Sequence, residues 1–82
     1  MVYKEVTINN QEGLNATTAA AVVQIAGKYV AKVLIEKGNK KINAKSIMGV
    51  LSLGAKPGDE IFVVADGDDE QAAMDAIVHI FE

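Results

Sequence analysis

The 82-residue chain has no cysteine and no arginine, and it has only one histidine and one proline. Without cysteine it cannot form disulfides, thiolate metal sites or a thiol nucleophile, which is compatible with a cytoplasmic protein. Nucleic-acid surfaces use clustered lysine and arginine. Here the net charge is −3 and the eight basic residues are scattered lysines, so we expect no direct nucleic-acid binding.

Long apolar runs are also missing, and none approaches the length of a membrane span. The first ten residues, MVYKEVTINN, alternate too strongly for a signal peptide. We therefore expect a cytoplasmic protein with no membrane segment. Half of the residues are apolar, which is enough for a packed core in one small domain spanning residues 1–82.

The spacing of the apolar residues predicts four strands and three helices. Alternation indicates a half-buried first strand, Gly38-Asn39 is a two-residue hairpin signal, and the apolar segment EIFVVA predicts a central strand. The predicted strands are 2–8, 32–37, 40–44 and 60–65, and the predicted helices are 16–26, the residues after Ser46 to about Leu53, and a terminal helix after Asp68. The order βαββαβα predicts an α+β fold, an open-faced β-sandwich whose four-stranded antiparallel sheet carries three helices on one face.

Local signals predict where the helices begin and end. Gly27 is expected to stop the first helix through a positive φ, and Asp68 is expected to cap the terminal helix with Gln71 reaching back as in a capping box. Two apolar faces are predicted to reach the core: Ala19, Val22, Val23 and Ala26 on the first helix, and Ala73, Met74, Ile77, Val78, Ile80 and Phe81 on the last.

The usual catalytic and metal-binding ingredients are sparse. His79 lies in the last turn of the terminal helix, where a dipole interaction and a contact with Asp75 explain it. The acidic residues Asp66, Asp68, Asp69 and Glu70 lack the spacing of a calcium loop. Lysines 37, 40 and 41 predict a solvated hairpin tip. We expect no metal, no cofactor and no enzymatic activity.

Two helix starts remain, and both offer unpaired backbone N–H groups that favour anions. They are GLNATTA at 13–19 and NAKSIMGVLSLGA at 43–55. At these segments, and along essentially its whole length, the chain resembles the HPr family of phosphocarriers of the bacterial sugar phosphotransferase system. The resemblance implies an HPr-like fold. The second segment is the more specific, because it resembles the regulatory serine region of members from low-GC Gram-positive bacteria.

The first segment departs from the phosphocarrier pattern at three positions. By this resemblance Asn15 stands in place of the phosphoacceptor histidine, Thr17 in place of an arginine and Thr18 in place of a proline. An amide nitrogen is neither a nucleophile nor a base near neutral pH, so phosphate transfer through Asn15 is excluded. Helix capping explains the three residues best, and an anion pocket formed by them is the alternative.

Ser46 stands at the start of the short helix, where serine is a favoured N-cap. The resemblance implies that Ser46 is phosphorylated by HPr kinase/phosphorylase. On the following helix Ile47, Met48 and Leu51 share one side, and Val50 and Leu53 lie on another. We expect the first set to be exposed, and in the family the corresponding patch docks partner proteins. The alternative is a helix buried on both sides.

The resemblance also implies a partner, a catabolite-control transcription factor of the LacI type that binds the phosphoserine form. A family branch called Crh likewise lacks the active histidine and retains the serine. Thr17 replaces an arginine that members of this branch are expected to keep for that contact. Two other functions stay open: a competitor that occupies phosphotransferase enzymes through Ile47, Met48 and Leu51, and residual phosphotransfer through His79, Thr17 or Thr18.

Overall fold

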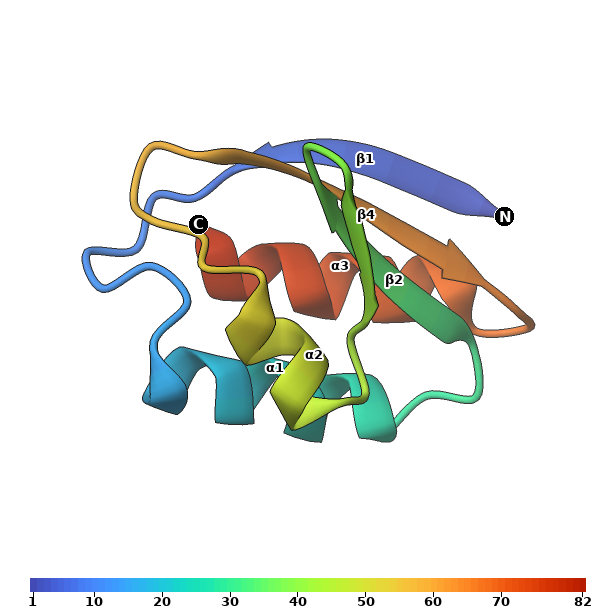
Figure 1. Ribbon diagram of the computed structural model, residues 1–82. Helices are drawn as coiled ribbons and strands as arrows, with labels where there is room; N and C mark the ends of the chain where they lie inside the picture. The colour runs from blue at the N-terminus through green and yellow to red at the C-terminus, as the bar shows by residue number, and fades with distance from the viewer.

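The chain folds into a four-stranded antiparallel sheet with three helices against one face, in a computed structural model that describes residues 1–82 (Figure 1). The strands are β1 (Val2–Thr7), β2 (Lys32–Lys37), β3 (Lys40–Asn43) and β4 (Glu60–Asp66), and the helices are α1 (Ala16–Gly27), α2 (Ile47–Ser52) and α3 (Glu70–Phe81). The predicted α+β fold and its βαββαβα order are confirmed. None of the three helices is long and apolar enough to cross a membrane.

The sheet has the strand order β1-β4-β2-β3, so the last strand in the sequence lies between the first and the second. This confirms the central position predicted for EIFVVA. Residues on β4 alternate between the two faces: Ile61, Val63 and Ala65 are buried, whereas Phe62 between them is 38% exposed. The apolar character of β4 therefore supplies two different surfaces, one for the core and one facing away from the helices.

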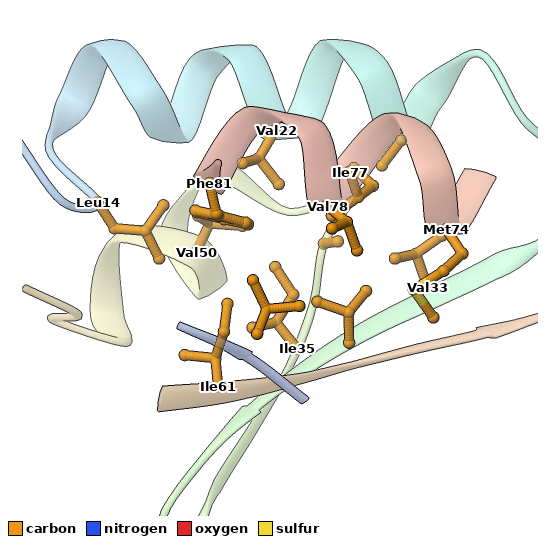
Figure 2. Close-up of a cluster of buried hydrophobic side chains, with 14 of the residues drawn as sticks. Leu14, Val22, Val33, Ile35, Val50, Ile61, Met74, Ile77, Val78 and Phe81 are labelled. Atoms are coloured by element: carbon orange, nitrogen blue, oxygen red, sulfur yellow. The ribbon is translucent and has the colours of Figure 1, made fainter. Parts of the chain in front are cut away.

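The core lies between the sheet and the helices. Figure 2 shows Val22 of α1 and Ile77 of α3 on the helix side, opposite Ile35 of β2 and Ile61 of β4. Twenty-one buried apolar residues form this single cluster, and no polar or charged side chain is buried in it. Burial of apolar surface at about 25 cal/mol per Å² is the main term that holds the helices to the sheet.

The β2–β3 hairpin closes as predicted. Lys37 pairs with Lys40 across the turn. Gly38 has φ +59°, and Asn39 keeps a negative φ. A positive φ at only the first of two central residues is the pattern of a type II′ turn, and glycine adopts it without steric cost. Pairing therefore runs directly up to a two-residue turn.

The predicted end of α1 is wrong. Gly27 has no positive φ and is the last residue of the helix. Lys28 follows it in a right-handed conformation (φ −78°, ψ −12°), and the Lys28 N–H donates to the Ile25 carbonyl at 3.1 Å. An i to i−3 bond of this kind satisfies a terminal carbonyl without a left-handed residue, so the helix tightens at its end and no glycine cap is required.

The predicted start of α3 is also wrong. Asp69, not Asp68, is the N-cap residue, and its side chain makes no capping bond to the helix. Its carboxylate instead accepts hydrogen bonds from the Val30 N–H at 2.9 Å and the Ala31 N–H at 2.8 Å. These bonds hold the pKa of Asp69 below its ordinary value, the Val30 bond contributing most. The start of α3 is thus tied to the α1–β2 loop.

Two smaller contacts on α3 differ from the prediction as well. The Gln71 amide donates to Asp75 at 2.9 Å instead of reaching back to a cap. With Asp75 engaged in this way, the His79 ring lies 3.7 Å from Glu82 at the exposed end of the helix. The expected His79–Asp75 contact is therefore replaced by one with the next carboxylate along the chain.

The lysines near the hairpin all have partners within the chain. Lys37 lies 3.4 Å from Asp59, Lys41 lies 3.8 Å from Glu36, and the Lys40 ammonium donates to the Ser52 carbonyl at 2.9 Å. The pairs are exposed or half-exposed, where each stabilises by roughly 0–1 kcal/mol. The three lysines therefore do not converge on one basic site.

Candidate functional site

Asn15 caps α1, as its residue type predicts. Its Oδ1 accepts a hydrogen bond from the Thr18 N–H at 2.9 Å, and its amide nitrogen donates to the carboxylate of Glu12. The side chains of Thr17 and Thr18 make no hydrogen bond, so of the three residues only Asn15 acts as a cap. Glu12, three residues before the cap, was not singled out by the sequence, because its role depends on the bend of the loop.

A shallow hollow opens beside this helix start, with a volume of about 400 Å³. It is lined by Asn10, Gln11, Glu12, Thr17, Thr18, Ala21 and Ile80. The only charged group in this lining is the Glu12 carboxylate, which repels an anion, and the only histidine of the chain is not part of it. The geometry therefore disfavours the anion pocket considered for Asn15, Thr17 and Thr18.

Ser46 caps α2. It has an extended backbone (φ −109°, ψ 116°), and its Oγ accepts a hydrogen bond from the Gly49 N–H at 3.2 Å. The side chain is half-buried and not enclosed. The neighbouring lysine points elsewhere, since the Lys45 ammonium donates to the Tyr29 carbonyl at 2.8 Å. The Ser46 hydroxyl thus stands at a helix start with no acidic or basic side chain bonded to it.

The helix behind Ser46 has the two different sides that were predicted. Ile47, Met48 and Leu51 are 40%, 73% and 38% exposed, whereas Val50 is fully buried and Leu53 is 2% exposed. The alternative of a helix buried on both sides is therefore wrong. We call the three exposed residues the α2 patch. They begin directly after the capping serine, so a change at Ser46 takes place at the edge of an apolar surface.

The two helix starts do not form one site. The loop before α1 rests on the segment after α2, since the Leu14 N–H donates to the Ala55 carbonyl at 3.0 Å. Gly13 (φ +63°) allows this approach, because a Cβ there would lie 2.8 Å from the Ala55 oxygen. Asn15 is therefore near the C-terminal end of α2, and Ser46 begins α2 at the other end.

The chain, including both of these helix starts, is similar to known proteins of one family. The family model described as "PTS HPr component phosphorylation site" matches residues 2–82. The HPr-like protein Crh of Halalkalibacterium halodurans is 44% identical over 100% of this chain and 98% of its own length. The phosphocarrier protein HPr of Treponema pallidum is 40% identical over 100% of this chain and 93% of its own length.

The fold agrees with a solved structure of the same family. The crystal structure of a phosphocarrier protein HPr from Bacillus anthracis superimposes with a TM-score of 0.95 at 38% identity, covering 99% of this chain and 96% of that one. Both Crh and HPr proteins are thus similar to this chain along nearly its whole length, and the family consists of phosphocarriers and related proteins, not of catalysts. The chain belongs to the HPr family.

Proposed function

We propose that this chain is a regulatory member of the family, phosphorylated at Ser46 by HPr kinase/phosphorylase, and that it is not a histidine phosphocarrier. The observation that carries the proposal is the position of the Ser46 hydroxyl at the edge of the α2 patch, whereas the start of α1 is capped by the amide of Asn15. ATP as the phosphate donor implies a cytoplasmic protein.

The N-termini of α1 and α2 differ in their chemistry, and the difference suits a regulatory switch at α2. A serine phosphate is a stable ester that adds about −1.5 to −2 charge, and at an N-cap this charge lies against the positive end of the helix. The Gly49 N–H already points at the Ser46 Oγ, so a phosphate oxygen there has a donor nearby. The Asn15 amide has no lone pair available for phosphorylation, and its nitrogen is bonded to Glu12.

The partner that we propose for the phosphorylated form is a catabolite-control transcription factor of the LacI type, docked on Ile47, Met48 and Leu51. Methionine adapts its shape to a binding surface, and Met48 is the most exposed of the three. Thr17 is exposed on α1 and offers no cation to such a partner. The α2 patch and the phosphate must therefore supply the contacts.

The test uses the fact that the chain has only two serines, Ser46 and Ser52, at either end of the same short helix. Incubation with ATP and HPr kinase/phosphorylase should add one phosphate to the wild type and to Ser52→Ala, and none to Ser46→Ala, as read by intact mass. Circular dichroism checks that both variants are folded. Labelling of Ser46→Ala, or no labelling of the wild type, would reject the proposal.

A second candidate is a competitor that occupies phosphotransferase enzymes without accepting phosphate. The exposure of the α2 patch favours this function, since such a protein would bind without modification. Calorimetric titration of the unmodified chain with the first enzyme of the phosphotransferase system tests this function, with Met48→Ser as the control. Absence of binding by the wild type eliminates it.

A further inference from the structure

The sheet face that points away from the helices is uncovered, because all three helices pack on the opposite face (Figure 1). The register lines up the side chains on this open face in cross-strand rows. One row joins Tyr3 of β1 to Val64 of β4 and Leu34 of β2. The next row joins Glu5 to Phe62 and Glu36.

An aromatic pair forms the centre of this face. Tyr3 is 68% exposed and Phe62 is 38% exposed, and their ring centroids are 5.9 Å apart with an interplanar angle of 36°. Val64 and Leu34, in the same row as Tyr3, are only half-buried. The open face thus presents two π-surfaces to solvent beside a short aliphatic row, and no element of the chain covers them.

Acidic groups adjoin the rings, and two of them have no cationic partner. Glu36 lies 3.8 Å from Lys41. Glu5 and Glu60, on neighbouring strands beside Phe62, form no ion pair with a lysine. Their proximity raises the pKa of Glu5, chiefly because its protonated form can donate a hydrogen bond to the Glu60 carboxylate, and then because the two negative charges repel each other. An uncompensated negative pair therefore stands against an exposed aromatic ring.

We propose that the open sheet face, centred on Tyr3, Phe62 and the Glu5–Glu60 pair, docks an arginine-bearing segment of a partner protein. A guanidinium is planar, so it can stack on an aromatic ring while its N–H groups bond to a carboxylate. A lysine ammonium supplies the charge without the flat surface. The combination of free rings and free carboxylates selects arginine.

The occupant is a different protein, not a second copy of this chain. The chain contains no arginine at all, so it cannot supply the group that the face selects. Two copies stacked face to face would also bring the acidic pairs of both against the same layer, and like charges oppose such an arrangement. The α2 patch lies on the helical side of the molecule, so the two surfaces can be occupied independently.

The experiment is a heteronuclear NMR titration of the ¹⁵N-labelled chain with the peptide acetyl-LRLRL-amide. The matched probes are the same peptide with citrulline in place of arginine, which keeps the shape and removes the charge, and spermidine, which carries at least as much positive charge and has no planar group. We expect saturable shifts of amides in β1, β4 and β2 with the arginine peptide, and much weaker effects of both controls.

Variants locate the binding on the protein. Phe62→Thr keeps strand propensity but removes the ring, and the double variant Glu5→Gln/Glu60→Gln removes the charge; each should weaken binding by about twofold to fivefold. Met48→Ser on the α2 patch should leave it unchanged. Equal binding of the citrulline peptide or of spermidine, shifts confined to α2, or concentration-dependent shifts of the chain alone would each overturn the proposal. None of these outcomes depends on phosphorylation of Ser46.

Discussion

At the scale of single residues, the proposed function depends on the side chains at two helix N-caps. An Asn15 amide and a Ser46 hydroxyl both accept a hydrogen bond from the first turn of a helix. As caps they are nearly equivalent. As phosphate acceptors they are not, since a kinase can esterify a hydroxyl and cannot modify a delocalised amide nitrogen. Structural similarity of the two positions therefore hides a chemical difference.

A first prediction isolates the structural role of Asn15. Replacing it by alanine removes the acceptor for the Thr18 N–H and should lower the free energy of unfolding by about 1 kcal/mol. The variant Thr17→Ala, in the first turn of the same helix and without a side-chain hydrogen bond to lose, serves as the control and should stay within about 0.5 kcal/mol of the wild type. Urea denaturation measures both. Kinase labelling of Asn15→Ala should be unchanged, and its loss would give Asn15 a functional role.

A second prediction concerns the acid stability that Asp69 confers. Because the pKa of its carboxyl is lowered in the fold, its contribution is complete above the ordinary value of about 3.9 and is lost as the pH falls through the folded pKa. Asp69→Asn should therefore melt several degrees lower than the wild type at neutral pH. The difference in melting temperature between the variant and the wild type should disappear toward low pH. A gap independent of pH would show that charge is not what matters at this position.

At the scale of elements, α2 is the shortest helix, and its six residues make it dependent on its cap. Ser46→Ala should lower the free energy of unfolding by about 1 kcal/mol. Ser46→Asp keeps an acceptor at the cap and places a negative charge at the helix start, so it should be as stable as the wild type. Thermal denaturation compares the three proteins. An equally unstable Ser46→Asp would mean that the cap geometry tolerates no negative group.

The elements also show how far the sequence could be used for prediction. Periodicity placed every helix and strand to within one or two residues, since the apolar faces of α1 and α3 are regular. The residues predicted for these faces are buried, except Val23 and Ile80, which are only partly buried against the core. The failures occur at helix ends. Asp69 is held by two backbone N–H groups 38 and 39 residues earlier in the chain, and no local pattern reports such a partner. A capping box was predicted where a tertiary contact exists.

The candidate site could be predicted only in part, because local spacing reports helix faces and does not report tertiary contacts. The two sides of α2 follow from helical spacing alone, and the exposure of Ile47, Met48 and Leu51 agrees with it. The bond from Asn15 to Glu12, and the hollow beside it, depend on how the loop bends back. The open sheet face was missed because register, not spacing, brings Tyr3 beside Phe62.

At the scale of the whole molecule, the helices on one face of the sheet leave the domain with one buried layer and two exposed surfaces of different character. The core holds only apolar side chains, and the charged groups lie outside it. The modification proposed at Ser46 would therefore change a surface without disturbing the interior. This separation would let a small domain be switched without being unfolded.

The chain has two phenylalanines, and substituting each one compares the contribution of the core with that of the open sheet face. Phe81, at the end of α3, is fully buried, and Phe81→Ala should cost roughly 3–5 kcal/mol of unfolding free energy through lost burial and a cavity. Phe62→Thr, on the open sheet face, should cost about 1 kcal/mol or less. Urea denaturation of both variants checks the difference. Similar losses would mean that the open face contributes to stability as the core does.

The proposed regulatory role is best tested by offering the protein two phosphate donors and mapping the phosphate by mass spectrometry. One reaction supplies ATP with HPr kinase/phosphorylase, and the other supplies phosphoenolpyruvate with the first enzyme of the phosphotransferase system. We predict one phosphate from ATP, on Ser46, and none from phosphoenolpyruvate. Phosphate transferred from phosphoenolpyruvate to His79, Thr17, Thr18 or any other residue would contradict this role.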